Sequence, residues 1–302
     1  MTDEATRGRR KGLLLGLGAY AMWGVLPIYF KAIGHVSPFE IVAHRIVWSL
    51  VFLGLLATIW KKWPGIRAAL ANRRVAMTLC LTALLIGANW IIWIWAVVNG
   101  HVLEGSLGYY LNPLVNVVLG VFLLKEKLTR GQVAAVCLAG AGVAVLAFGA
   151  GGGIWISLSL AASFALYGYF RKVAPVDSVE GLTIETALLT PLALGFILYL
   201  QGRGDSALFA GEPLTDTLLI AGGIITAVPL LLFTAAARRL PYSTLGFLQY
   251  IAPSTQFALA VLVYGERFTL AHAICFGAIW TALVIFAAEG LRMGAKARAE
   301  AR

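Results

Sequence analysis

Apolar residues run along this chain in ten long stretches, separated by short segments that hold most of the charged residues. Each stretch is close to the roughly 20 residues that a helix needs to cross the hydrocarbon core of a bilayer. Lipid offers no partners to an open sheet edge, so the stretches are predicted to be helices. Their limits are residues 12–33, 38–60, 75–98, 102–124, 131–149, 154–171, 180–200, 215–237, 243–264 and 269–290. The pattern therefore predicts an all-α polytopic membrane protein with ten transmembrane helices.

Composition strengthens this prediction and excludes other classes of protein. Of the 302 residues, 60% are hydrophobic and 13% are charged, whereas soluble proteins are nearer half apolar and a quarter charged. A net charge of +10 would indicate nucleic acid in a soluble protein. Here the basic residues flank apolar spans, where they set topology and meet anionic headgroups. We therefore expect membrane lipids as partners, and no nucleic acid.

The basic residues also predict an orientation. If the N-terminus is cytoplasmic, most of the 24 lysines and arginines fall on the cytoplasmic side, as the positive-inside rule requires. Residues 1–11 then form a basic cytoplasmic N-terminus, and residues 291–302 form a basic cytoplasmic tail. The first apolar run is too long for a signal peptide and is predicted to be a span. We expect a multi-pass protein of the plasma (inner) membrane with both termini inside.

Matching residues recur at a shift of 140 positions. The recurring pairs include Tyr110 and Tyr250, Pro113 and Pro253, Glu126 and Glu266, and Glu40 and Glu180. Each half holds five spans, an odd number, so the second half enters the membrane from the opposite side. We predict two inverted five-helix repeats at residues 12–149 and 150–290, with Gly149–Gly153 as a linker rather than a phosphate-binding loop. Such repeats hold a substrate near the midplane, between the halves.

The second span carries ionisable residues into the membrane. Glu40 and His44 are four apart and share a helix face, and Arg45 lies roughly 10 Å deep at about 1.5 Å per residue. An arginine at that depth needs a partner or a water-filled cavity; the alternative is that it snorkels outward and anchors the helix. Glu104, at the start of the fourth span, is the predicted ion-pair partner of Arg45, with Glu40 as the competitor. A carboxylate near a titrating histidine can also carry a coupling proton, and structural pairing alone is the alternative.

Polar and aromatic residues of the third and fourth spans form a second group. Asn89 lies near mid-membrane, and Trp90 and Trp93 can line one helix face as a stacking wall; an aromatic belt at the interface is the alternative. In the fourth span, Tyr109 and Asn112 follow helical spacing beside a proline that frees a backbone carbonyl. Hydrogen bonding between helices is the alternative role for the amides.

The second half does not copy this chemistry. Arg45 maps onto Glu185, which the inverted topology puts towards the inner side, and Gln249 and Gln256 are the predicted polar lining there. Pro113 and Pro253 recur, so we interpret them as structural hinges. The complete set of candidate substrate-binding or coupling residues is Glu40, His44, Arg45, Asn89, Trp90, Trp93, Glu104, Tyr109, Tyr110, Asn112, Glu185, Gln249, Tyr250 and Gln256.

Several of these motifs resemble one family. They are Pro38-Phe39-Glu40, Ala43-His44-Arg45, Asn89-Trp90 to Trp95-Ala96-Val97, Asn99-Gly100-His101, Ser106-Leu107-Gly108-Tyr109, Asn112-Pro113 and Lys125-Glu126-Lys127-Leu128. Together they resemble the drug/metabolite transporter superfamily in its EamA-domain form, and most closely its RarD branch, whose members carry a chloramphenicol-sensitivity label. The resemblance covers essentially all ten spans. It implies two five-helix EamA repeats around a central cavity in the plasma membrane, and it says little about cargo.

The function predicted from these features is transport. The chain has no Walker lysine loop and no catalytic motif, and its three cysteines show no disulfide or metal spacing. We therefore expect no enzyme activity, no metal and no cofactor, and a membrane enzyme is disfavoured. The leading hypothesis is a secondary active transporter of a small metabolite or drug-like solute by alternating access, with protons as a candidate coupling ion. The alternative is a passive facilitator or pore; monomer and homodimer are both left open.

Overall fold

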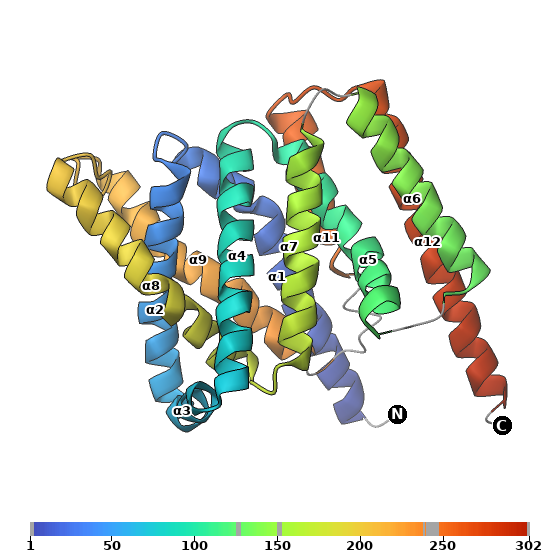
Figure 1. Ribbon diagram of the computed structural model, residues 1–302, viewed down its shortest axis with the longest axis horizontal. Helices are drawn as coiled ribbons and strands as arrows, with labels where there is room; N and C mark the ends of the chain where they lie inside the picture. The colour runs from blue at the N-terminus through green and yellow to red at the C-terminus, as the bar shows by residue number, and fades with distance from the viewer. Residues whose placement is uncertain (1–2, 125–127, 150–152, 238, 240–247, 301–302) are drawn as a thin grey trace.

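The computed structural model describes residues 3–124, 128–149, 153–237, 239 and 248–300 (Figure 1). Every regular element among these residues is a helix. The elements are α1 (Asp3–Ala32), α2 (Pro38–Ile59), α3 (Trp63–Ala71), α4 (Arg73–Val98), α5 (Val102–Leu124), α6 (Arg130–Gly149), α7 (Ile154–Val173), α8 (Ser178–Arg203), α9 (Pro213–Ala237), α11 (Ile251–Ala258), η1 (Leu259–Val263) and α12 (Leu270–Glu300). The all-α prediction is confirmed for the described residues.

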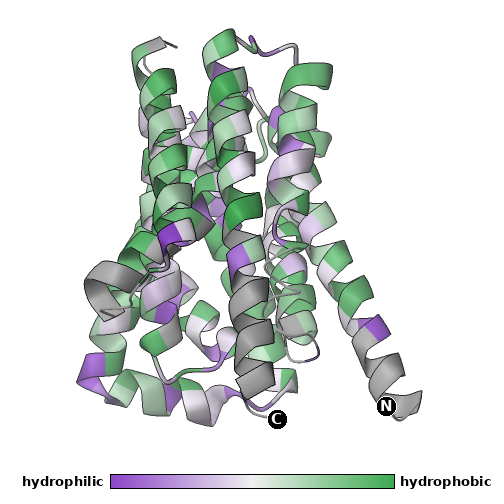
Figure 2. Cartoon of the chain, turned by 90° about the vertical axis from the view of Figure 1, so that its right-hand side faces the viewer, coloured by the Kyte–Doolittle hydropathy of each residue, from purple (hydrophilic) through white to green (hydrophobic). Residues whose placement is uncertain are grey.

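Six of the described helices are long and apolar enough to cross a membrane. Their qualifying segments are Arg10–Ala32, Pro38–Ile59, Arg73–Val98, Arg130–Phe148, Ser178–Arg203 and Pro213–Phe233. Large apolar side chains point outward along them; Phe148 is 93% exposed and Leu192 is 73% exposed. Figure 2 shows mainly hydrophobic residues along the coloured parts of the helices that face the viewer. An apolar surface of this extent is typical of a protein that lies in lipid.

The short helix α3 was not among the predicted elements. It lies in the segment between the second and third predicted spans, and it begins at Trp63 with a proline at its N-terminus. Ile66 and Ala69 are buried against a cluster that includes Leu79 and Ile184. Asn72 then caps α4, because its side-chain oxygen accepts hydrogen bonds from the backbone N–H groups of the second and third residues that follow it. Packing against α4 and α8, rather than a long apolar run, therefore stabilises α3.

The ninth predicted span, 243–264, is described only in part. Residues 240–247, at the start of this span, and residues 125–127 of the Lys125-Glu126-Lys127-Leu128 motif lie outside the described residues. The described part is α11 followed by the π-helical turn η1, in which the N–H of Tyr264 donates to the carbonyl of Leu259 at 2.9 Å. Such turns are uncommon and occur frequently at functional sites. Gly265 follows with a φ of 63°, a left-handed conformation that favours glycine.

The helices pack in pairs across the bundle (Figure 1). Helix α2 packs on α8 and α9, α5 and α4 both pack on α7, and α1 packs on α9 and α11. Helices α6 and α12 lie side by side along one edge and make most of their contacts with each other. Helix α1 begins and α12 ends at the same end of the bundle, where α3 also lies (Figure 1). The interior between α1, α2, α4, α5 and α9 contains the polar residues described next.

Candidate functional site

Arg45 on α2 is the central residue of the candidate site. Its side chain is buried, with 7% of the residue exposed. Its Nε donates a hydrogen bond to Oγ1 of Thr226 on α9 at 2.5 Å, and the Thr226 hydroxyl donates in turn to the carbonyl of Gly222 at 2.7 Å. Nη1 of Arg45 is buried and has no hydrogen-bond partner among the described residues. The guanidinium therefore points into the protein rather than snorkelling to the surface.

Aromatic rings enclose the Arg45 guanidinium. Its Cζ lies 4.6 Å from the centre of the Trp90 ring on α4 and 5.8 Å from that of Phe30 on α1. Contacts at this distance stabilise a cation through the negative ring face. The pairing of Arg45 with Glu104 or Glu40 expected from the sequence is not formed, because neither carboxylate lies in an ion pair with it. Rings, rather than carboxylates, are its described neighbours.

The amide of Asn89 extends the site along α4. Its Nδ2 donates to the backbone carbonyl of Leu160 at 3.1 Å and to Oγ of Ser163 at 2.9 Å, both on α7. Its Oδ1 accepts from the Tyr109 hydroxyl at 3.4 Å. The Trp93 ring meets Tyr109 edge to face, with centroids 5.2 Å apart. Trp90 and Trp93 are both buried, so they line the interior and do not form an interfacial belt.

Tyr110 and Tyr250 face each other where α5 meets α11. Their rings are stacked with centroids 6.1 Å apart and planes 18° apart. The hydroxyl groups of Tyr110 and Ser254 share a hydrogen bond at 2.6 Å, and Ser106 donates to the carbonyl of Pro253 at 2.8 Å. Pro253, a predicted hinge, lies in the first turn of α11. The side chain of Pro113, its counterpart on α5, lies outside the described residues.

Glu185 on α8 is another buried ionisable group, with 0% exposed. Its Oε1 accepts a hydrogen bond from the Thr82 hydroxyl on α4 at 2.6 Å, and its Oε2 accepts from the Tyr167 hydroxyl at 3.3 Å. Nε of Arg171 lies 3.5 Å from Oε1. Opposite charge and two hydroxyl donors thus compensate this carboxylate.

Glu40 and His44 lie near the start of α2. One oxygen of Glu40 accepts hydrogen bonds from the Ser206 hydroxyl at 3.1 Å and from the N–H of Ala207 at 2.8 Å. His44 Nε2 is 3.8 Å from the same oxygen. Glu40 therefore connects the first turn of α2 to the loop that follows α8, rather than facing Arg45.

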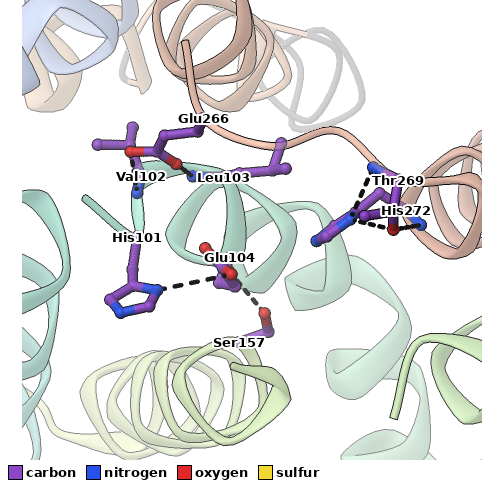
Figure 3. A network of polar contacts seen from close by, with 8 residues as sticks. All are labelled: His101, Val102, Leu103, Glu104, Ser157, Glu266, Thr269 and His272. Carbon is purple, nitrogen blue, oxygen red and sulfur yellow. Dashed lines mark hydrogen bonds and ion pairs between the residues drawn. The ribbon is translucent and has the colours of Figure 1, made fainter. Parts of the chain in front are cut away.

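Glu104 belongs to a separate polar cluster at the start of α5 (Figure 3). Nδ1 of His101 is 3.6 Å from its carboxylate, and Ser157 donates to its backbone carbonyl at 2.6 Å. The carboxylate of Glu266 caps α5 by accepting hydrogen bonds from its first two N–H groups, those of Val102 at 3.0 Å and Leu103 at 2.8 Å. Burial raises the pKa of Glu266, and these two N–H donors oppose the shift.

Sequence reasoning missed several contributors to these groups. Thr226 and Thr82 are ordinary members of apolar segments and carry no sequence signal. Phe30 and Arg171 recur as Phe170 and Lys31 at the shift of 140, but this recurrence does not link them to the residues that they contact. Glu266 did carry a signal, since it recurs from position 126 at the shift of 140. A residue that recurs at a span end is a candidate cap, and this is the role of Glu266 in the structure.

The remaining predicted residues are amides. Asn112 is fully buried, and both of its side-chain polar atoms lack hydrogen-bond partners within the described part of the chain. Gln256 donates to the carbonyl of Trp23 at 3.1 Å, while its Oε1 meets no described donor. Gln249 is half-buried. Among the described residues, no group of three or more His, Cys, Asp or Glu side chains is arranged to hold a metal ion.

Comparison with known proteins identifies the family. Over 289 residues the chain is 46% identical to an uncharacterized transporter of Vibrio cholerae, a match that covers 96% of this chain and 96% of the relative. The chain belongs to the EamA-like transporter family. The family's own profile matches residues 10–148, which correspond to the first predicted repeat. A second relative, Protein RarD of Escherichia coli, is 44% identical over 93% of this chain and 95% of its own length.

These matches confirm the predicted resemblance to the RarD branch of the EamA-like transporters. A solved crystal structure aligns with 93% of this chain and 98% of its own, at a TM-score of 0.58 and 22% identity; that likeness concerns the fold alone. This EamA-like protein is thus a membrane transporter of the drug/metabolite type, embedded in a membrane and acting on a small molecule. The EamA-like family is a family of transporters, which agrees with the expectation that this protein is not an enzyme.

Proposed function

We propose that this protein is a secondary active transporter that carries a small metabolite or drug-like solute across the plasma (inner) membrane by alternating access. Ten spans in two inverted five-helix repeats form its frame, with both termini in the cytoplasm. The two halves rock about a site between them, so the site opens to one side at a time. Arg45, Asn89, Trp90 and Tyr109 are the proposed recognition residues, and protons are the proposed coupling ion.

The helix boundaries support the repeat. Helices α2 and α8 begin at residues 38 and 178, α4 and α9 at 73 and 213, and α6 and α12 at 130 and 270. Each pair of starting positions differs by the 140 residues seen in the sequence repeat. Independent helices have no reason to keep one spacing, so a duplicated five-helix unit is the simplest account.

The packing supports the repeat independently. If α1, α2, α4, α5 and α6 are exchanged for α7, α8, α9, α11 and α12, the main helix contacts map onto one another. The α2–α9 contact becomes α8–α4, α5–α7 becomes α11–α1, and α4–α7 becomes α9–α1. Tyr110 and Tyr250, two copies of one position, stack against each other. A pseudo-two-fold axis between these rings accounts for all four relations.

Two hydrogen bonds that cross between the halves carry the alternating-access proposal. Arg45 on α2 reaches Thr226 on α9, and Glu185 on α8 reaches Thr82 on α4. The two ionisable residues are 140 positions apart, and each lies about 10 Å from the start of its helix at about 1.5 Å per residue. In the inverted topology one bond lies nearer the outer face and the other nearer the inner face. Breaking one while keeping the other opens one side.

Two carboxylates near helix starts, one on α2 and one on α8, form a second pair of contacts between the proposed halves, one at each end of the bundle. Glu40 holds the loop after α8 through Ser206 and Ala207. Glu180, its counterpart, lies 3.8 Å from Lys62 in the segment after α2. We infer that these two contacts close the outer and the inner ends, respectively.

Cross-linking tests whether the halves move. In a variant without the three native cysteines, the pair Glu40→Cys and Ala207→Cys would close the outer end, and Lys62→Cys with Glu180→Cys would close the inner end. In proteoliposomes tested with labelled amino acids, aromatic acids and phosphorylated metabolites, either disulfide should stop flux, and reduction should restore it. A passive pore with immobile halves would keep its flux in both oxidised variants.

Proton coupling is tested separately. The cluster of His101, Glu104 and Glu266 at the predicted outer end is the proposed entry point for protons, since it unites titratable groups with partial burial. An imposed pH gradient should drive uphill flux in proteoliposomes, and Glu104→Gln should remove that drive. Flux that ignores the gradient would eliminate protons as the coupling ion and leave transport itself intact.

A further inference from the structure

We propose that the transported solute is an organic anion, and that its oxyanion group, a carboxylate or a phosphate, binds the Arg45 guanidinium. The inference rests on the transport function proposed above and names the chemical class of its substrate. It starts from the charge balance of the site. Arg45 is buried, and the ion pairs formed by described residues do not include it. Its charge therefore has no described counter-charge.

The described hydrogen bonds do not compensate this charge either. Thr226 accepts from Nε, but Nη1 is buried with no acceptor among the residues that the structure describes. The Trp90 and Phe30 rings stabilise the cation through their faces, and they offer no lone pair to an N–H group. A buried charge is unfavourable unless opposite charge and a full set of hydrogen bonds compensate it. An oxyanion supplies both, and the planar guanidinium matches carboxylate and phosphate geometry.

A second arginine, the half-buried Arg171, shows that this imbalance is specific to Arg45. Arg171 also has a buried Nη1 that meets no described hydrogen-bond partner. However, its Nε lies 3.5 Å from the Glu185 carboxylate, so its charge is paired within the protein. An imperfect hydrogen-bond set alone would not suggest a ligand. A ligand is indicated where a buried charge lacks both a counter-charge and a hydrogen-bond acceptor, and within the described chain Arg45 lacks both.

The surroundings favour an anion with an apolar or aromatic body over a zwitterion. Trp90 and Phe30 flank the guanidinium, and Trp93 and Tyr109 continue the aromatic wall. The ammonium group of an amino acid would need a carboxylate nearby. Glu185, the buried carboxylate of α8, is already engaged by three side chains. Among its described residues, the site thus offers one cation and aromatic surface, with no free anion beside them.

Binding of matched probes tests this proposal and does not require the natural solute. The purified full-length protein is titrated with benzoate, phenyl phosphate, benzamide and benzylamine, which present a carboxylate, a phosphate, a neutral amide and a cation on the same ring. Thermal unfolding should shift upward with one or both anions, and not with benzamide or benzylamine, since a ligand of the folded state raises its stability. Preference for phenyl phosphate would assign the oxyanion as a phosphate, and preference for benzoate as a carboxylate. Equal shifts with benzamide, or no shift with either anion, would overturn the proposal.

Variants assign the effect to Arg45. Arg45→Gln should weaken binding of the anion at least tenfold, and Arg45→Lys should retain part of it, because the charge remains while the planar fork is lost. The matched control is Arg203→Gln, which removes the same charge from the exposed end of α8 and should bind as the wild type does. If Arg45→Gln does not fold, the lysine variant and the wild-type probe series still decide the question. Unchanged binding in a folded Arg45→Gln protein would overturn the assignment.

Flux measurements separate this inference from the transport proposal. The anion that binds is offered to proteoliposomes, with protein-free vesicles as the background. Arg45-dependent binding without flux would support the anion site and contradict transport of that anion. Saturable flux of benzamide or benzylamine that is unaffected by Arg45→Gln would support transport and overturn the anion site.

Discussion

Arg45 and Glu185 occupy equivalent positions of the proposed repeat, and their surroundings differ. They are 140 residues apart, and both are buried. Each bonds a threonine of a neighbouring helix, Thr226 on α9 for Arg45 and Thr82 on α4 for Glu185. Glu185 also has a cation and a tyrosine hydroxyl beside it. Arg45 has aromatic rings and an N–H group without a described acceptor. Described side chains thus compensate the charge of Glu185, whereas the charge of Arg45 has no described counter-charge, and this difference is the basis of the anion proposal.

The largest difference is expected when the counter-charge of Glu185 is removed. Arg171→Met leaves a buried carboxylate without its cation, and breaking a buried ion pair lowers the free energy of unfolding by about 3 kcal/mol. Arg45→Met removes an unfavourable buried charge together with its Thr226 hydrogen bond and its ring contacts. These two effects oppose each other, so the unfolding free energy should change by less than about 1 kcal/mol. Thermal and denaturant unfolding of the detergent-purified proteins would measure both. Similar losses in the two variants would mean that the two positions are compensated alike.

A smaller effect is expected from the helix contact beside Arg45. A Cβ at Gly223 on α9 would overlap the backbone of Trp48 and Ser49 on α2. Gly223→Ala should therefore force α2 and α9 apart and destabilise the protein by about 2 kcal/mol.

Gly87→Ala is the matched control at the α4–α8 contact. There the added Cβ would meet only the flexible end of Leu189, at 3.3 Å. It should be near neutral, or gain up to about 1 kcal/mol in helix propensity. Equal losses in the two alanine variants, measured by thermal unfolding, would contradict a closer backbone contact on the Arg45 side.

The two buried amides Asn112 and Asn89 differ in their hydrogen bonds, and this difference can be tested by substitution. Both of its side-chain polar atoms are buried without described partners, whereas Asn89 has three hydrogen bonds. Asn112→Leu should raise the unfolding free energy by about 1 kcal/mol, since an unsatisfied buried amide is unfavourable, and Asn89→Leu should lower it by a similar amount. Opposite signs in thermal unfolding would support a ligand-facing role for Asn112. Destabilisation of both variants would indicate that Asn112 is satisfied within the fold.

The smallest expected effect is a pH dependence at Glu266. Burial holds its pKa above the ordinary value, so the folded protein binds this proton more readily than the unfolded chain. The stabilising contribution is present below the ordinary pKa of about 4.3 and is lost as pH rises through the higher folded value. Acidification should therefore raise the unfolding temperature of the wild type slightly more than that of Glu266→Gln.

The control for this measurement is Glu212→Gln, at an exposed carboxylate. It removes a carboxylate of the same kind from the surface, so the two variants separate the buried position from the loss of a charge in general. If Glu266→Gln and the wild type respond to acid in the same way, Glu266 does not titrate with a raised pKa.

The contacts within the site were less predictable than the helices. Arg45, Asn89 and Trp90 were expected in the interior, and all three are buried there. The prediction of an ion pair between Arg45 and Glu104 was wrong, because Glu104 lies beside His101 and Ser157 at the start of α5. Depth along each helix can be counted from the sequence. Rotation about the helix axis, which decides which neighbour a side chain meets, depends on packing that no single span encodes.

The hydrophobic pattern alone was sufficient for the all-α membrane class and for most helix limits, because lipid demands long apolar helices wherever the chain crosses it. The recurrence at 140 residues predicts that Arg45 and Glu185 are counterparts, and this stays a prediction. Packing between distant segments settled the rest: the short helix α3, the π-helical turn η1, the Glu266 cap and the aromatic enclosure of Arg45. These features join residues from different helices, and the energy of such contacts exists only once the helices are assembled.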